Sequence, residues 1–275
     1  MGLFQIAERN HNLADKIVRP NSDIMYAGIV SGNNVGVVWA DDVFCPVFCI
    51  IWSEHLKGFH FMGRDYKHVN KEDLKKFIDS TLIPFLRNIN LRDFEFSCDS
   101  PELIPFVCDI FLDFDLKRYK QYVYKLEKVK DINNEIVAPV GYEVYNINED
   151  FIYNKLKNIK NPEVVQSDID ENWGSVSNFI KHGKGFIAAK DNMICSLVMT
   201  RFLYNGTHCI GTETFASHKN KGLASALAVS IFNGIVKDGG SIWWDCSADN
   251  IASQKTACKA GLVFSHEYEV FWFKL

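Results

Sequence analysis

The sequence predicts an α/β (α+β) protein with a mixed, mostly antiparallel sheet flanked by helices. Short apolar runs with strand-like alternation recur along the 275 residues, and amphipathic helical stretches separate several of them. Hydrophobic residues make up 47% of the chain and charged residues 23%, which supplies a packed core and excludes bulk disorder. Because this length exceeds that of a usual single domain, we expect two domains, at 1–138 and 139–275.

The residue pattern of the first half predicts an α+β domain, but it does not identify the role of that domain. Its expected elements are a helix over 3–17, a hairpin of strands 35–39 and 43–52 turning at Asp41-Asp42, a strand over 59–62, a helix from Lys71 that Pro84 kinks or ends, a strand over 94–98, a short helix after Pro101 and a strand over 119–126. Charged and polar residues cluster over 127–135, and the domain boundary is placed after them, at 138.

The second half has clearer periodicity. Its expected elements are a strand over 141–145, a helix from Asn148, a helix over 170–181, strands over 185–190, 194–202 and 208–215, a helix from Lys221, a strand over 241–246, a helix after Asp249 and a strand over 263–273. The helix from Lys221 carries Leu223, Leu227, Ile231 and Ile235 on one stripe and ends at Gly239-Gly240. A similar closing order of strands and helices over 59–126 leaves an internal duplication as one alternative.

Composition excludes several classes of protein. A formal net charge of −4 argues against a large nucleic-acid surface or a polybasic membrane anchor. The longest apolar run, 43–52, contains a proline and is too short to cross a bilayer, and the N-terminus lacks the apolar core of a signal peptide. The eight scattered cysteines indicate reduced, buried thiols, so we expect a cytoplasmic protein. No spacing of histidine, cysteine or carboxylate predicts a metal site.

The stretch SHKNKGLASALA, 217–228, lies between an expected strand and a long amphipathic helix. The first amides of a helix lack intrahelical partners and carry partial positive charge, so a phosphate can bind there. Gly222 permits close approach to the backbone, and Lys219 and Lys221 can screen phosphate charge. An ordinary strand-to-helix turn explains these residues equally well.

Two segments together resemble the GNAT N-acetyltransferase superfamily. Lys219-Asn220-Lys221-Gly222-Leu223-Ala224 resembles its acetyl-CoA loop, although Lys219 replaces the usual arginine or glutamine. The segment 243–262 resembles its second signature through Asn250, Ser253 and Gly261. The resemblance covers the second half and implies a GNAT acyl-CoA N-acyltransferase fold there, preceded by an α+β domain that is either unrelated or a degenerate GNAT-like half.

The resemblance also implies a set of site residues. Thr214, Phe215 and Ala216 would form the strand edge for the pantetheine arm, the amides of Lys219, Asn220, Lys221, Gly222, Leu223 and Ala224 would hold the pyrophosphate, and Asn250 and Ser253 would line the opposite wall. Glu213, just before that edge, is the candidate base for the acceptor amine, with a structural salt bridge or a solvent-facing role as the alternatives. The usual general-acid position holds Ala257, so Cys258, His266 and Tyr268 are the substitutes considered.

The sequence therefore predicts an acetyl-CoA-dependent N-acetyltransferase that transfers the acetyl group directly to a primary amine of a small molecule. We expect the first half to help build or cap the acceptor site and to hold no second cofactor. The alternatives are a catalytically silent acyl-CoA-binding module and an interaction protein that binds no cofactor. A homodimer remains open, and neither nucleic acid nor membrane is expected as a partner.

Overall fold

The computed structural model describes residues 2–126 and 139–275, so the boundary predicted at 138 lies outside the described residues. The chain forms two compact units. The N-terminal unit comprises Met1–Gln121 and Tyr268–Leu275, and the C-terminal unit comprises Tyr122–Glu267. The last strand of the chain therefore contributes residues to both units.

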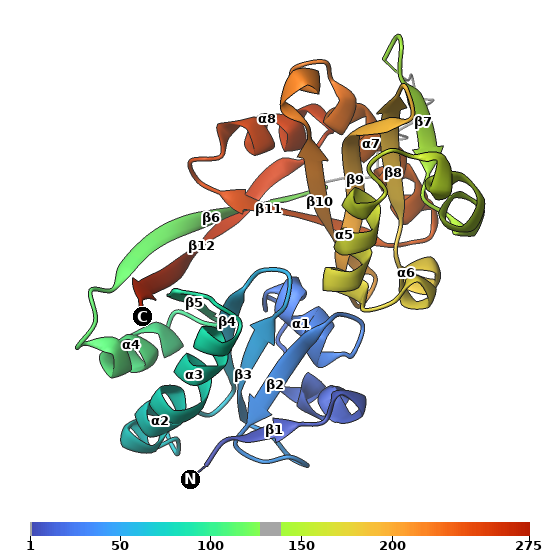
Figure 1. The fold of residues 1–275 in the computed structure, drawn as a ribbon. Coiled ribbons are helices and arrows are strands. Elements are labelled where there is room, and N and C mark those ends of the chain that lie inside the picture. The colour runs from blue at the N-terminus through green and yellow to red at the C-terminus, as the bar shows by residue number, and fades with distance from the viewer. Residues whose placement is uncertain (1, 127–138) are drawn as a thin grey trace. The chain divides into compact units, whose positions relative to one another are not determined.

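The N-terminal unit has helices on both faces of its strands (Figure 1). Its strands are β1 (Phe4–Ile6), β2 (Gly36–Ala40), β3 (Phe48–Ser53), β4 (Gly58–Gly63), β5 (Asp93–Cys98) and part of β6 (Lys117–Lys125), with the end of β12 (Val263–Lys274). Its helices are α1 (Ile24–Val30), α2 (Lys71–Phe77), α3 (Ile83–Asn88) and α4 (Leu103–Cys108). The strands follow the order β1-β2-β3-β4-β5-β12-β6, in which β4 and β5 are parallel.

Aromatic side chains form the main core of this unit, on the face of the strands that α2, α3 and α4 cover. Phe94 stacks on Phe59 and Phe273 at ring-centroid distances of 4.7 and 5.1 Å, and Phe96 stacks on Phe271 at 5.3 Å. The last strand of the chain thus supplies two rings to the core of the N-terminal unit. Helix α1 packs on the other side, against β2 and β3.

The predicted N-terminal helix is only partly correct. Phe4–Ile6 pairs with β2 as an antiparallel strand, and a 3-10 helix over Glu8–Ile17 follows. Helix α1 was not predicted, because all seven of its residues are buried and the segment therefore lacks an amphipathic period. Its start was nevertheless marked by Asp23, whose side chain accepts a hydrogen bond from the Met25 amide.

The helix predicted from Lys71 continues past Pro84. A π-helical turn over Ile78–Leu82 joins α2 to α3, and Pro84 lies in the first turn of α3. The wider turn accommodates a residue that has no amide hydrogen to donate, so Pro84 changes the helix without ending it.

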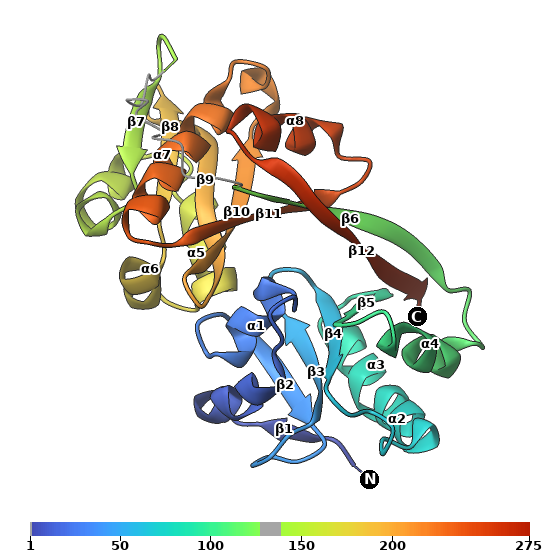
Figure 2. The same ribbon diagram turned by 180° about the vertical axis from the view of Figure 1, so that it is seen from behind.

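The C-terminal unit is a second layered α/β arrangement, seen from behind in Figure 2. Its strands are β7 (Glu143–Asn146), β8 (Gly185–Lys190), β9 (Met193–Tyr204), β10 (Thr207–Thr214) and β11 (Ser241–Ser247), with the remaining parts of β6 and β12. Its helices are α5 (Glu163–Trp173), α6 (Val176–His182), α7 (Leu223–Lys237) and α8 (Ile251–Lys259). The strands follow the order β12-β6-β11-β10-β9-β8-β7.

Two apolar clusters cover the faces of this second set of strands. Helices α7 and α8 pack on one face, where the predicted stripe of Leu223, Leu227, Ile231 and Ile235 is buried. Helices α5 and α6 pack on the other face. The single helix predicted over 170–181 is two helices, because Gly174 adopts a left-handed conformation that ends α5 and the Ser175 side chain caps α6. The helix predicted from Asn148 is a π turn and a 3-10 turn over 151–158.

The two units share the same order of strands and helices. In each, three antiparallel strands lead into a helix, a strand parallel to the third, a further helix and a last strand. In the N-terminal unit, residues 270–274 of β12 pair with β5. The shared order of elements favours the degenerate GNAT-like description of the N-terminal half.

All eight cysteines are free thiols, but their predicted burial is only partly correct. Cys45 and Cys258 are exposed, because Cys45 lies in the loop between β2 and β3 and Cys258 on the outer face of α8. None of the helices in the described part of the chain combines the length and apolar character that a membrane span requires. Within residues 2–126 and 139–275, no three histidine, cysteine or carboxylate side chains gather as metal ligands would.

Candidate functional site

Strands β10 and β11 are paired along only part of their length. Their parallel register runs from Thr207↔Ser241 to Ile210↔Trp244, although both strands continue beyond it. On its other side β10 stays paired with β9 as far as Thr214↔Ser196. Among the described strands, the edge of β10 over 211–214 therefore has backbone groups without a strand partner. An extended ligand chain can hydrogen-bond to such an edge.

The end of β10 is fixed on its β9 side. The Thr214 and Ser196 hydroxyls are 2.8 Å apart, and the Ser196 hydroxyl also donates to the Glu213 carbonyl at 3.1 Å. The Phe215 amide donates to the Cys195 carbonyl at 3.0 Å, and the Phe215 ring packs on the cluster beneath α5. A 3-10 turn over Ala216–His218 follows. The turn into α7 consequently starts from a rigid position.

The turn before α7 contains two left-handed residues. Asn220 has φ of 62° and Gly222 has φ of 77°, and a Cβ at Gly222 would meet no atom within 4 Å. Glycine is required here for conformation and not for space. Gly222 is the N-cap of α7, no side chain caps this helix, and its first turn holds no acidic residue. Uncapped amides and the helix dipole make this turn suited to an anion.

Lys219 and Lys221 are exposed beside this turn. The Lys221 ammonium donates to the Tyr142 hydroxyl at 3.0 Å, and the same hydroxyl is 2.7 Å from Nδ1 of His218. Sequence analysis missed Tyr142, since it precedes β7 and is far from Lys221 in the chain. No local pattern around Tyr142 signals its position.

Asn250 and Ser253 are close together at the start of α8. The Asn250 side chain accepts the Ser253 amide at 3.1 Å and caps the helix, while the Ser253 hydroxyl accepts from the Trp244 indole at 2.9 Å. Ser253 thus links α8 to β11, while Asn250 fixes the start of the helix. Their predicted contact with a cofactor stays a prediction.

Glu213 is exposed, at the second-last position of β10. Strand alternation places its side chain on the face opposite to Thr212 and Thr214. Among the described residues its carboxylate has no hydrogen-bond or ion-pair partner, so the salt-bridge alternative is not what the structure contains. The carboxylate therefore faces solvent.

The substitutes considered for the general acid lie apart. Ala257, at the usual position, is fully buried beneath α7, and Cys258 is exposed on α8. Burial, with the nearby Lys125 charge, lowers the pKa of His266, whose ring meets Trp243 edge-on at 5.3 Å. Tyr268 belongs to the N-terminal unit, near Asp23. Of Cys258, His266 and Tyr268, His266 is therefore the residue that lies in the C-terminal unit and has a ring contact there, with Trp243.

A partly buried ion pair between α5 and β9 was also missed. Nε and Nη2 of Arg201 lie 3.0 and 2.7 Å from one Asp168 carboxylate oxygen. The Arg201 side chain crosses Gly211, where a Cβ would lie 2.1 Å from Nε. The signal for this contact was a glycine inside a strand, which often marks a close approach by another group.

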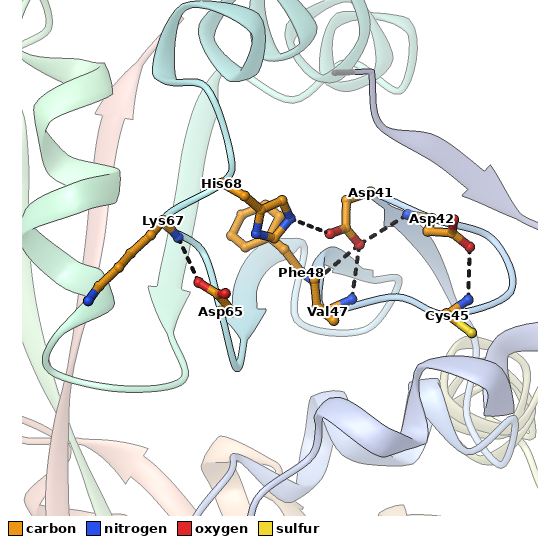
Figure 3. Close-up of polar contacts among 8 residues, drawn as sticks. All are labelled: Asp41, Asp42, Cys45, Val47, Phe48, Asp65, Lys67 and His68. Carbon is orange, nitrogen blue, oxygen red and sulfur yellow. Dashed lines mark hydrogen bonds and ion pairs between the residues drawn. The ribbon is translucent and has the colours of Figure 1, made fainter.

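The turn after β4 in the N-terminal unit corresponds in position to the turn before α7, but carboxylates take part in its polar contacts (Figure 3). Asp65 accepts the Lys67 amide at 3.2 Å, and the His68 ring contacts the buried Asp41 carboxylate at 2.8 Å. Helix α2 is capped by the Asn70 side chain and has Glu72 and Asp73 in its first turn. Carboxylates at this position oppose the binding of a phosphate.

Comparison with known proteins matches residues 15–271 to the family model described as GNAT acetyltransferase. The chain is 24% identical over 237 residues to the uncharacterized N-acetyltransferase YdfB of Bacillus subtilis, which covers 86% of this chain and 85% of that relative. The GNAT resemblance seen in the sequence is thereby confirmed, and it extends over both units.

Solved structures show the same fold over the whole chain. A GCN5-related N-acetyltransferase-like protein from Streptococcus suis aligns with a TM-score of 0.64 at 16% identity, covering 98% of this chain and all of the other. A tandem GNAT protein from the clavulanic acid biosynthesis pathway aligns with a TM-score of 0.57 at 8% identity, covering 99% and 98%. These similarities confirm the predicted fold class.

Proposed function

The chain belongs to the GNAT acetyltransferase family, and we propose that it is an acetyl-CoA-dependent N-acetyltransferase that acts on a primary amine of a small molecule. Transfer is direct, within a ternary complex, without a covalent enzyme intermediate. The active site is in the C-terminal unit.

One observation carries this proposal. The pairing of β10 with β11 stops at Ile210↔Trp244, and the uncapped left-handed turn at Asn220 and Gly222 follows β10 after one 3-10 turn. An unpaired strand edge and an anion-binding turn are the two features needed to hold a pantetheine arm and a pyrophosphate. The unpaired edge over 211–214 leads into Phe215 and Ala216, so Thr214, Phe215 and Ala216 lie at its end, and the amides of 219–224 face the pyrophosphate.

Acetyl-CoA supplies an activated thioester carbonyl and a thiol leaving group. An ordinary amine is protonated at neutral pH and must lose a proton before it can attack, and Glu213 accepts that proton directly or through water. The leaving thiol, with a pKa of about 8.5, departs largely as thiolate, so the reaction does not depend on a strong general acid. This chemistry fits a site in which Ala257 occupies the usual tyrosine position.

A catalytically silent acyl-CoA-binding module is the second candidate. Ala257 at the usual acid position and Lys219 at the first position of the loop favour it. Both candidates require binding of acetyl-CoA, so only turnover separates them.

The test begins with acetyl-CoA and a thermal-melt assay of the full chain. A ligand at one hundred times its dissociation constant stabilises the folded state by about 2.7 kcal/mol, and the absence of any shift would contradict both candidates. A panel of primary amines is then assayed for release of the free thiol. Turnover of an amine supports the enzyme, whereas binding without turnover of any amine supports the silent module.

Glu213→Gln tests the base once an acceptor is found. We expect kcat/KM to fall about a hundredfold near neutral pH and to recover as rising pH supplies the neutral amine, with unchanged affinity for acetyl-CoA. Glu163→Gln, an exposed carboxylate at the start of α5, is the matched control and keeps full activity. Equal pH profiles for Glu213→Gln and the unaltered protein would show that Glu213 is not the base.

A further inference from the structure

Tyr142, His218 and Lys221 form a compact polar cluster at the rim of the turn before α7. The Lys221 ammonium is 3.0 Å from the Tyr142 hydroxyl and 5.7 Å from the centre of its ring. The Tyr142 hydroxyl is 2.7 Å from Nδ1 of His218, and the two rings meet at 81° with centroids 5.6 Å apart. Two segments distant in sequence therefore hold the Lys221 side chain in one place.

The cluster carries positive charge that no carboxylate of the described chain balances. Neither Lys219 nor Lys221 has an acidic residue within ion-pair distance among residues 2–126 and 139–275. Lys184 of the same unit, in contrast, pairs with Asp238 at 2.7 Å. Immobilising a flexible lysine without a counter-charge costs side-chain entropy, and that cost is offset when an anion binds.

The hydrogen bonds also determine which donors remain for a ligand. Lys221 donates to the Tyr142 oxygen, which can then donate its own hydrogen to Nδ1 of His218. His218 in this tautomer carries its hydrogen on Nε2. The remaining Lys221 hydrogens and the His218 Nε2–H together form a set of side-chain donors that is separate from the backbone amides of the turn.

We propose that Tyr142, His218 and Lys221 form a subsite for a phosphate monoester dianion, which in coenzyme A is the 3′-phosphate. Lys221 contacts the phosphate, His218 donates to it from Nε2, and Tyr142 is a positioning residue that orients both. This inference rests on the proposed function, because the backbone amides are taken to bind the pyrophosphate of the same cofactor. It adds a preference for cofactors that carry the 3′-phosphate.

Isothermal titration of the full chain with coenzyme A and with 3′-dephospho-coenzyme A tests the subsite. The unaltered protein is expected to bind coenzyme A about tenfold more tightly than the dephospho form. Lys221→Ala abolishes that preference, Lys221→Arg retains it, and Tyr142→Phe reduces it about threefold. Lys237→Ala, at the opposite end of α7, removes the same charge and leaves the preference unchanged.

The steady-state parameters give a second readout. Lys221→Ala is expected to raise KM for acetyl-CoA about tenfold with kcat unchanged, as loss of uniform binding predicts. Equal loss of affinity for both ligands in Lys221→Ala would overturn the subsite, because Lys221 would then serve the pyrophosphate. Failure of the unaltered protein to bind either ligand would instead overturn the proposed function, and the subsite with it.

Discussion

The two units of this protein repeat one order of strands and helices but differ in how their two parallel strands pair. In the N-terminal unit, β4 and β5 are paired from Phe59↔Phe96 to Phe61↔Cys98, and the Asp99 amide extends the pairing by donating to the Phe61 carbonyl at 2.9 Å. In the C-terminal unit, the equivalent pairing of β10 with β11 stops while both strands continue.

Side chains reinforce the closed pair in the N-terminal unit. His60 of β4 and Ser97 of β5 are buried and linked, with Nδ1 2.8 Å from the serine hydroxyl. Tyr26 of α1 stacks on His60 at 4.5 Å. In the described residues the register of β10 with β11 does not extend beyond Ile210↔Trp244. The comparison teaches that one order of strands can leave a strand edge open or close it through a few local contacts.

The largest effect is expected in the part of β12 that belongs to the N-terminal unit. Phe273 is buried in the N-terminal unit, stacked on Phe94, with Phe114 4.1 Å away between ring centroids. Phe273→Ala leaves a cavity in the aromatic core and is expected to lower the free energy of unfolding by about 3–5 kcal/mol. Urea denaturation measures the loss, and hydrogen exchange should localise it to the N-terminal unit.

Phe264→Ala is the control on the same strand. Phe264 belongs to the C-terminal unit and is half exposed, so its replacement is expected to cost about 1 kcal/mol or less. A similar cost for both variants, or exchange of the same amides in both, would contradict the division of β12 between the units.

The two units are expected to lose stability over different ranges of acidic pH. Burial, together with the Lys184 charge, lowers the pKa of His208 in the C-terminal unit to about 4. The unfolded chain takes up this proton near pH 6.5 and the folded chain does not, so stability falls as the pH drops from about 6.5 to 4. His208→Gln should remove about 3 kcal/mol of the loss between pH 7 and 4, measured by denaturation at several pH values.

Asp99 of the N-terminal unit is the counterpart. Burial alone would raise its pKa, but the nearby His60, 3.8 Å away, and Arg19, 3.9 Å away, outweigh burial and lower it. Its contribution is present above the unfolded pKa near about 4 and is lost only as the pH falls below that value. Asp99→Asn should therefore change the pH profile below about pH 4, and an unchanged profile in that range would contradict the assignment.

The sequence predicted much of the C-terminal unit because its signals are local. The stripe from Leu223 to Ile235 and the glycine turn before it depend on residues within one helix and its start. Glu213 lies on the strand that was predicted before the turn, since a strand pattern depends only on neighbouring residues.

The remaining features depend on contacts between distant segments. Tyr142 and Lys221 are 79 positions apart, so no window of sequence contains both. The division of β12 between two units could not be predicted, because an apolar strand does not specify which sheet edge it joins. The point where β10 and β11 part depends on backbone twist and packing, and not on a motif.

The last prediction compares the two turns directly. Gly222→Ala and Asn70→Ala are each expected to cost about 1 kcal/mol, the first through the left-handed conformation and the second through the lost cap on the Asp73 amide. Their effects on the affinity for acetyl-CoA should differ. Gly222→Ala redirects the amides before α7 and is expected to weaken binding about tenfold, while Asn70→Ala leaves binding unchanged, with one equivalent bound per chain by titration. Two equivalents bound per chain, or weaker binding in Asn70→Ala, would show that the N-terminal unit also holds a cofactor.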